Sequence, residues 1–178
     1  DMRRANQAII RERYTIPKID DVLPELHNAT VFSKIDLREG CHQILLHPQS
    51  RPITTFASHK GLFQYKRLIY GVNSAFESFQ KQMEIVLSGC KGAKNISDDI
   101  IIWGTTLEEH NNNLDAVLSR IETDGLKINP KKCIFAVSSL IFSGHQLSAE
   151  GVSPDPKKDV EITKIKPPES VAEVKSFL

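Results

Sequence analysis

The stretch Lys94-Asn95-Ile96-Ser97-Asp98-Asp99-Ile100-Ile101-Ile102-Trp103 places two adjacent carboxylates between two apolar runs. Side chains alternate faces along a strand, so neighbouring aspartates inside one strand would point to opposite sides of a sheet. At the tip of a tight hairpin, both side chains can reach a common site. We therefore expect a β-hairpin with Asp98 and Asp99 at its turn. A solvated turn without a chemical role is the alternative, because Asp is a common turn residue.

The composition is that of one globular domain with a real core, since 40% of the 178 residues are apolar and 25% are charged. No apolar run approaches the length of a membrane helix, and the N-terminus has no signal-peptide pattern. Three cysteines without a CxxC motif suggest neither a disulfide framework nor a zinc site and fit a reducing, intracellular setting. The net charge of +1 gives no global argument for nucleic acid.

The first third of the chain predicts one short helix and several strands. Apolar residues recur at helical spacing over 19–26, and Pro24 should shorten or kink that helix. Residues 31–36 read as a strand that ends at Asp36, and residues 41–46 read as a second strand.

A further pair of strands is expected on either side of the turn at 59–61, from 54–56 and 62–65. Lys66 and Arg67 follow this hairpin, which is therefore both basic and aromatic. Such a surface can serve bases and phosphates, or it can be a solvated sheet edge.

The remaining pattern predicts two long helices and further short strands. An amphipathic helix over 76–87 is closed by Gly89, and a second helix begins after a capping box formed by Thr106 and Glu109. Short strands should follow over 134–137 and 140–142, and a last helix restarts at Ser170. This order favours an α+β fold with helices packed on one face of a largely antiparallel sheet. Because the chain stops inside an apparent helix, we expect it to be a fragment.

Asp36 at a strand end could meet Asp98 and Asp99 if their strands are neighbours in that sheet. Three carboxylates could then hold two Mg²⁺ ions, because hard cations prefer oxygen ligands. In such sites the ions lie about 4 Å apart, one lowering the pKa of an attacking hydroxyl and the other stabilising the leaving oxygen.

Several longer motifs follow one another along the chain. They are Phe32-Ser33-Lys34-Ile35-Asp36-Leu37-Arg38-Glu39-Gly40-Cys41-His42-Gln43-Ile44, Tyr65-Lys66-Arg67-Leu68-Ile69-Tyr70-Gly71-Val72-Asn73-Ser74-Ala75, Ile96-Ser97-Asp98-Asp99, Gly125-Leu126-Lys127-Ile128-Asn129-Pro130-Lys131-Lys132-Cys133, Phe142-Ser143-Gly144-His145 and Gly151-Val152-Ser153-Pro154-Asp155-Pro156-Lys157-Lys158. These motifs occur in the order found in reverse transcriptases of gypsy-type LTR retrotransposons, and the chain resembles that family over nearly its whole length. The resemblance implies a right-hand polymerase palm from a pol polyprotein, acting as an RNA-directed DNA polymerase that adds deoxynucleotides to a primer 3′-hydroxyl.

The resemblance also implies roles for individual residues. Asp36 and Asp98 would bind the catalytic Mg²⁺ or Mn²⁺ ions with help from the Leu37 carbonyl, and Asp99 would complete the carboxylate set. Lys132, or its neighbour Lys131, would lie near the departing pyrophosphate, where a basic loop without a role is the alternative. The implied nucleotide-binding positions are Leu37, Cys41, Tyr70 and Gly71, the primer-grip positions are Phe142, Gly144 and His145, and Arg3 is a further candidate for a structural or nucleotide contact.

Cys41 departs from the family pattern, in which an aromatic residue commonly floors the sugar pocket and excludes a 2′-hydroxyl. Cysteine is far smaller, so the sequence predicts weaker sugar discrimination or reduced activity. Ile96 stands where many members have Tyr, and Ile96-Ser97-Asp98-Asp99 resembles a variant seen in one gypsy subgroup.

The family pattern assigns residues 1–150 to a fingers remnant and the palm, and residues 151–178 to the connection with the thumb and its start. Expected partners are a primed RNA or DNA template and deoxynucleoside triphosphates, with no membrane, inside the cell in a cytoplasmic particle or the nucleus. One alternative is an inactive retroelement relic that at most binds nucleic acid. A two-metal nuclease is another, although it explains none of the motifs beyond the carboxylates.

Overall fold

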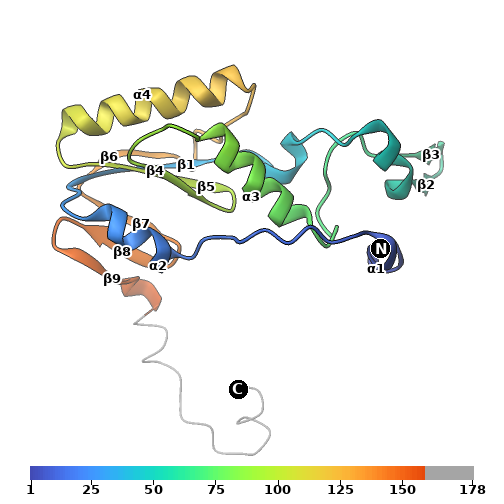
Figure 1. Ribbon diagram of the computed structural model, residues 1–178, viewed down its shortest axis with the longest axis horizontal. Coiled ribbons are helices and arrows are strands. Elements are labelled where there is room, and N and C mark those ends of the chain that lie inside the picture. Colours follow the sequence, from blue (N-terminus) through green and yellow to red (C-terminus); the bar gives the residue numbers. More distant parts are fainter. Residues whose placement is uncertain (159–178) are drawn as a thin grey trace, which may run out of the picture.

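The centre of the molecule is a four-stranded sheet with the strand order β4-β5-β1-β6, in which all neighbours run antiparallel. The computed structural model describes residues 1–158. Figure 1 shows the sheet with a long helix above it and a second sheet below it. The central strands are β1 (Val31–Asp36), β4 (Ala93–Ile96), β5 (Asp99–Gly104) and β6 (Ile134–Val137).

Strands β1 and β5 are buried on both faces, which explains why β5 is an unbroken apolar run rather than an alternating one. Ile35 lies opposite Ile100, and both belong to the core on one face. Phe32 lies opposite Trp103, and both belong to the core on the other face. The sheet is therefore the middle layer of the fold, with a hydrophobic core on each side.

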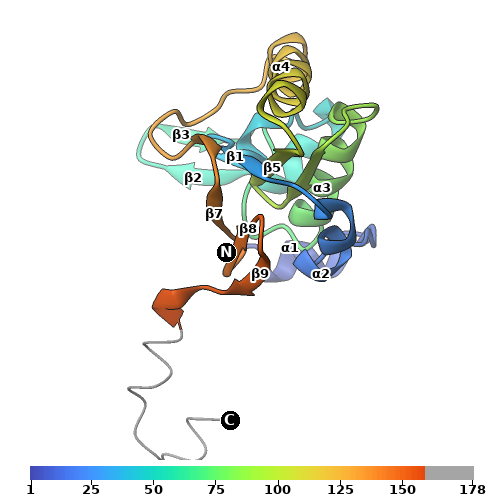
Figure 2. The ribbon, with the colours of Figure 1, turned by 90° about the vertical axis from the view of Figure 1, so that its left-hand side faces the viewer.

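Two long helices cover the first face, α3 (Ala75–Val86) and α4 (Leu107–Thr123), as predicted. Figure 2 shows α4 on the side of the sheet away from the second sheet. Their apolar residues recur at helical spacing and pack on Ile35, Ile100 and Ile102 of the sheet. The buried apolar residues of the two helices are Ala75, Phe79, Met83, Val86, Val117 and Ile121.

A buried polar contact fixes α4 against the sheet. His110 is fully buried, and its Nε2 lies 2.7 Å from the Ser33 hydroxyl of β1. The same hydroxyl accepts a hydrogen bond from the Ala136 backbone N–H of β6 at 2.9 Å. Gly104 permits α4 to lie this close to the sheet, because a Cβ at position 104 would lie only 2.4 Å from the backbone nitrogen of His110. One serine thus joins β1, β6 and α4.

The second face is covered by a short helical segment and a three-stranded antiparallel sheet with the order β7-β8-β9. Helix α2 has four residues and is followed directly by the 3₁₀ helix η1, so the short helix predicted from Pro24 is confirmed. Strands β8 and β9 were not predicted from the sequence. These elements are α2 (Ile19–Val22), η1 (Leu23–Leu26), β7 (Ser139–Phe142), β8 (His145–Ser148) and β9 (Gly151–Pro154).

The hairpin region, residues 48–63, lies at the opposite end of the molecule from the second sheet (Figure 1). It contains the 3₁₀ helix η3 (Pro48–Thr54) and the predicted hairpin of β2 (Phe56–Ser58) and β3 (Gly61–Phe63). All six residues of these two strands are exposed. Helix α1 (Arg3–Ala8) lies at the same end and buries none of its residues.

The strand predicted over residues 41–46 is wrong. The chain turns at Glu39, which has a positive φ of 52°, and forms the 3₁₀ helix η2 (Gly40–Gln43). The Arg67 guanidinium donates to the carbonyls of His42 and Gln43, at 3.3 and 2.8 Å, where a strand would need a backbone partner. A contact with a residue more than twenty positions away therefore overrides the local strand pattern.

The capping box predicted before α4 is only half formed. The Thr106 hydroxyl accepts a hydrogen bond from the Glu109 N–H at 3.1 Å, as expected of an N-cap. The Glu109 carboxylate, however, accepts from the backbone N–H of Thr105 rather than from that of Thr106. The helix predicted from Ser170 lies outside the described residues. Within residues 1–158, no helix is both long enough and apolar enough to cross a membrane.

Candidate active site

Asp36 and Asp99 are direct cross-strand neighbours at the ends of β1 and β5. The hairpin of β4 and β5 turns at Ser97, which has a positive φ of 54°, and Asp98 completes the turn. The Asp98 carbonyl accepts a hydrogen bond from the Leu37 N–H at 3.0 Å. The predicted hairpin is therefore confirmed, and it places all three aspartates at one end of two adjacent strands.

The Asp98 carboxylate is unusually placed. Its Oδ1 atom is buried and has no hydrogen-bond partner among the described residues. Burial raises its pKa, and the nearby carboxylates of Asp99 and Asp36 raise it further, whereas Lys132 acts in the opposite direction. An unpartnered buried carboxylate oxygen costs free energy, so this oxygen is available to a cation that enters the site.

Gly40 makes room for this carboxylate. A Cβ at position 40 would lie only 2.2 Å from Asp98 Oδ1 and 2.8 Å from its Cγ. The segment after β1 passes so close to Asp98 that a larger residue would displace the acid. No role was predicted for Gly40 from the sequence, although a glycine four residues after Asp36 is a signal that the backbone there passes close to another group.

Two lysines contact the other aspartates. Lys34 Nζ lies 2.6 Å from Asp99 Oδ2, and both side chains are largely shielded from solvent. Lys132 Nζ lies 3.6 Å from Asp36 Oδ2, and its side chain is 67% exposed. Lys132 thus lies beside the carboxylates, and the place of Lys132 or Lys131 near a departing pyrophosphate stays a prediction. Lys34 was not predicted as a site residue, although it lies two positions before Asp36, and residues two apart on a strand share a face.

The donor set fits a divalent cation at two of the three aspartates. Asp98 has the unpartnered oxygen, and Asp36 lies beside it with only a long contact to an exposed lysine. Asp99 is already paired with Lys34. Among residues 1–158, no three His, Cys, Asp or Glu side chains are arranged as a ready-made metal cluster. Asp99 as a direct metal ligand, and the Leu37 carbonyl as a further one, stay predictions.

Of the residues assigned to nucleotide binding, Leu37 precedes η2, Cys41 lies within it, and Tyr70 and Gly71 belong to the segment before α3. Cys41 is fully buried, and burial with the nearby Asp98 carboxylate raises the pKa of its thiol to about 11. Tyr70 is 43% exposed, and its ring packs against His42 and Phe76 with ring centroids 5.1 and 6.2 Å apart. Gly71 has a positive φ, and its carbonyl accepts a hydrogen bond from Asn6 of α1 at 2.8 Å. Of these side chains, Tyr70 presents the aromatic surface.

The predicted primer grip forms the turn between β7 and β8. Phe142 is buried in the core on the second face of the central sheet, so it anchors the turn rather than reaching solvent. Gly144 has a positive φ of 79°, and His145 Nδ1 lies 3.2 Å from the Ser143 carbonyl. The turn lies on the same face as Asp36 and Asp99, because both aspartates alternate in register with core residues of that face.

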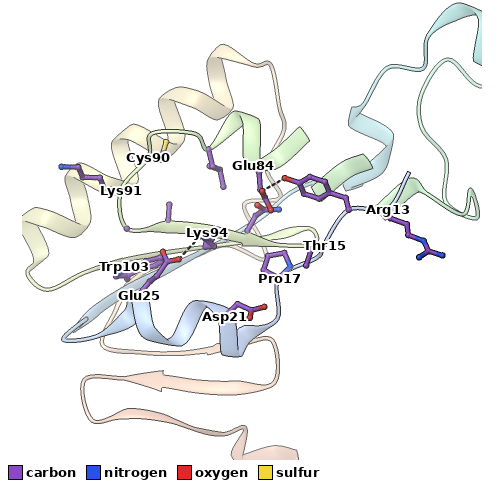
Figure 3. A pocket seen from close by; sticks show the side chains of 15 residues that line it. Arg13, Thr15, Pro17, Asp21, Glu25, Glu84, Cys90, Lys91, Lys94 and Trp103 are labelled. Atoms are coloured by element: carbon purple, nitrogen blue, oxygen red, sulfur yellow. Dashed lines mark hydrogen bonds and ion pairs between the residues drawn. The ribbon is translucent and has the colours of Figure 1, made fainter. Parts of the chain in front are cut away.

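A cavity with a volume of about 1060 Å³ lies elsewhere, along the free edge of β4 (Figure 3). The side chains that line it carry both positive and negative charges, and several of them already have partners. Lys94 donates to Glu25 at 2.8 Å, and the Tyr14 hydroxyl donates to Glu84 at 2.6 Å. None of the three aspartates lines this cavity, so its size does not mark the catalytic centre.

The comparisons with known proteins agree with this geometry. Residues 1–149 match the family model described as reverse transcriptase (RNA-dependent DNA polymerase). The chain belongs to the reverse transcriptase family. This reverse transcriptase domain is 36% identical to the Pol polyprotein of transposon 412 from Drosophila melanogaster, over 89% of the chain and 13% of that protein. It is 31% identical to that of the Drosophila transposon gypsy, over the whole chain and 17% of that protein.

Solved structures show the same fold. The foamy viral protease-reverse transcriptase in complex with double-stranded DNA superposes with a TM-score of 0.90 at 22% identity, covering 99% of this chain and 31% of that one. The same viral enzyme with an RNA/DNA hybrid gives a TM-score of 0.83 over 24% of its length. The predicted α+β palm is confirmed. The reverse transcriptase domain spans only a small part of each of these proteins.

Proposed function

We propose that this reverse transcriptase domain is the palm of an RNA-directed DNA polymerase that extends a primer 3′-hydroxyl with deoxynucleotides. The observation that carries the proposal is the buried, unpartnered oxygen of Asp98 beside Asp36, at the ends of paired strands in a chain of this family. Phosphoryl transfer needs mainly alignment and charge neutralisation, and a rigid sheet buried on both faces supplies the alignment.

Asp36 and Asp98 would hold the divalent cations, Mg²⁺ or Mn²⁺. When bound, these ions supply charge neutralisation at the phosphates and lower the pKa of the attacking hydroxyl. Lys34 holds Asp99 in place through their ion pair. Lys132 can stay beside Asp36 or turn outward toward a leaving pyrophosphate, because its side chain is mostly exposed. The β7–β8 turn would steady the primer end through Gly144 and His145.

The proposed partners are a primer annealed to RNA or DNA and deoxynucleoside triphosphates, inside the cell. The foamy viral relatives in fold are described in complex with double-stranded DNA and with an RNA/DNA hybrid. In this chain, the exposed aromatic side chains of the hairpin region offer flat surfaces of the kind on which bases stack. We assign residues 1–150 to the fingers remnant and palm, and residues 151–178 to the connection with the thumb and its start.

The test is primer extension on poly(rA)/oligo(dT) with Mg²⁺ or Mn²⁺, using this chain joined to the flanking regions of a related transposon polyprotein. Asp98→Asn should nearly abolish extension, because it removes a charged metal ligand. Asp115→Asn is the matched control, because Asp115 is exposed on α4. No extension by either variant or by the parent, from a folded protein that still binds primer-template, would favour the inactive relic instead.

A further inference from the structure

A buried side-chain amide of α3 lies beside the turn at Ser97 and Asp98, here called the Asp98 turn. Gln80 is only 1% exposed, although the core-facing side chains of this helix are mainly apolar. Its Oε1 accepts a hydrogen bond from the Ser97 N–H at 3.3 Å and another from Asn95 Nδ2 at 3.1 Å. Its Nε2 donates to Asn95 Oδ1 at 3.2 Å. A buried amide fixes local geometry, because its polar atoms need partners.

The backbone that Gln80 contacts is in an unfavourable conformation. Ser97 has a positive φ of 54°, and a residue with a Cβ stays in this left-handed region only when its surroundings hold it there. Hydrogen bonds support the Asp98 turn from two directions. The Leu37 N–H donates to the Asp98 carbonyl at 3.0 Å, and the Ser97 N–H is bound by Gln80. The direction of the Asp98 carboxylate therefore depends on α3 as well as on β1.

Glu84, one turn further along α3, determines which way the Gln80 amide points. Its Oε1 accepts from Gln80 Nε2 at 3.2 Å, and its Oε2 accepts from the Tyr14 hydroxyl at 2.6 Å. An ionised carboxylate can only accept, so the NH₂ end of the amide faces Glu84 and the oxygen faces Ser97. Among residues 1–158, Glu84 forms no ion pair with a cation. The bond to Glu84 raises the pKa of Tyr14, so this phenol remains a donor.

We propose that Gln80 is a positioning residue for the Asp98 turn. Glu84 and Tyr14 set the orientation of its amide, so hydrogen bonds connect the extended segment before Pro17 to the candidate active site. With the amide turned over, two donors would face each other at the Ser97 N–H and the hydrogen bond would be lost. The Asp98 carboxylate would then lose its fixed direction, because the strained residue before it would be free to relax.

The catalytic importance of this positioning rests on the proposed polymerase function, because a fixed Asp98 serves to hold a cation in line with a primer. The positioning itself can be measured without catalysis. Amide exchange at Ser97 and the binding of Mn²⁺ alone need neither primer nor nucleotide. If the parent failed to extend primers while substitution of Glu84 still changed both measurements, the polymerase function would fail and the positioning would stand.

The experiment compares Glu84→Gln with the parent chain. This change keeps the shape of the side chain but adds a donor, so the Gln80 amide no longer has one preferred orientation. Glu122→Gln is the matched control, because it makes the same change at an exposed position on α4. We expect hydrogen exchange of the Ser97 amide, measured by NMR, to become about five- to tenfold faster in Glu84→Gln, the value of one hydrogen bond.

Two further measurements report on the carboxylates. The affinity of the 178-residue chain for Mn²⁺, followed by electron paramagnetic resonance, should fall about threefold or more in Glu84→Gln and stay unchanged in Glu122→Gln. In primer extension with the flanking regions joined, Glu84→Gln should lower kcat about tenfold and leave the KM for deoxynucleotide unchanged. Tyr14→Phe removes only the outer hydrogen bond and should change all three values in the same direction by less.

Three outcomes would overturn the proposal. Ser97 exchange could stay at the parent rate in both Glu84→Gln and Tyr14→Phe, or Glu122→Gln could change it as much as Glu84→Gln does. In the third, Ser97 exchange would become faster while the Mn²⁺ affinity and kcat stayed unchanged. Gln80 would then support the backbone without directing Asp98. Circular dichroism melts of each variant separate a general loss of stability from these local changes.

Discussion

The central sheet region, formed by β1, β4, β5, β6, α3 and α4, differs sharply from the hairpin region at residues 48–63. In the sheet region, strands β1 and β5 are buried on both faces, and the aspartates lie where these strands end. In the hairpin region, Phe56 and Phe63 stack on each other at a centroid distance of 5.9 Å, yet each stays nearly half exposed. Packing therefore fixes the positions of the side chains in the sheet region, whereas the hairpin region leaves aromatic side chains exposed and able to contact a partner.

The largest expected difference in stability comes from the same truncation made in both regions. Phe79→Ala removes a fully buried ring of α3 and should lower the free energy of unfolding by about 3–5 kcal/mol. Phe56→Ala removes a partly exposed ring whose contacts are mainly aromatic and should cost about 1 kcal/mol or less. Urea unfolding followed by circular dichroism measures both values. Equal losses would show that the hairpin region has a core of its own.

The second prediction concerns the geometry of the carboxylates. Gly40→Ala should reduce primer extension by about 100-fold or more, because its Cβ would displace the Asp98 carboxylate and misplaced catalytic groups lose rate steeply. Gly61→Ala in the hairpin region is the contrasting variant, because its Cβ would meet no atom within 4 Å and only its positive φ would be strained. If Gly40→Ala extended primers as well as the parent does, the close approach would have no catalytic importance.

Much of the sheet region could be predicted because its signals are local. Apolar spacing and terminal glycines located α3 and α4, and two β-branched arms around paired acids located the hairpin of β4 and β5. The strand predicted over 41–46 was wrong because Gly40 must pack on Asp98, and Arg67 holds the carbonyls of η2. Strands β8 and β9 were missed because their burial depends mostly on one residue, Leu147.

The difference between local signals and contacts with distant residues applies to the candidate site as well. From a strand end and a turn, the sequence predicted that Asp36 could meet the Asp98-Asp99 pair if their strands are neighbours, and the pairing of β1 with β5 confirms this. The hydrogen bonds that hold the surrounding backbone in place could not be predicted in the same way. Gln43 binds the backbone of Lys127, 84 residues away, and no periodicity marks such a pair. Long-range hydrogen bonds between a side chain and the backbone therefore mark the limit of what the sequence predicts here.

The third prediction tests a polar contact of the sheet region against a similar one in the hairpin region. Ser33→Ala should lower the free energy of unfolding by about 2 kcal/mol, because it leaves the buried His110 ring and the Ala136 N–H without their shared partner. Ser58→Ala removes an exposed hydroxyl that accepts a hydrogen bond from the Lys60 N–H, and it should change the free energy of unfolding by less than about 0.5 kcal/mol. The denaturant midpoints of both variants measure the two changes, and equal shifts would contradict the prediction.

The smallest expected effect concerns the segment that joins α1 to the sheet region. Arg11 donates to the carboxylate of Glu77 on α3 at 2.9 Å, and this bond holds the pKa of the shielded Glu77 below its usual value of 4.5. A lowered pKa in the folded state contributes stability that is fully present above pH 4.5 and is lost as the pH falls through the folded pKa. Arg11→Gln should therefore destabilise the chain slightly at pH 7 and flatten the decline in acid. Thermal melts from pH 7 down to pH 3 test this, with Arg13→Gln as the control on the same segment. If the melting temperatures of the parent and of Arg11→Gln fell in parallel with pH, the ion pair between Arg11 and Glu77 would contribute nothing to the stability of the sheet region.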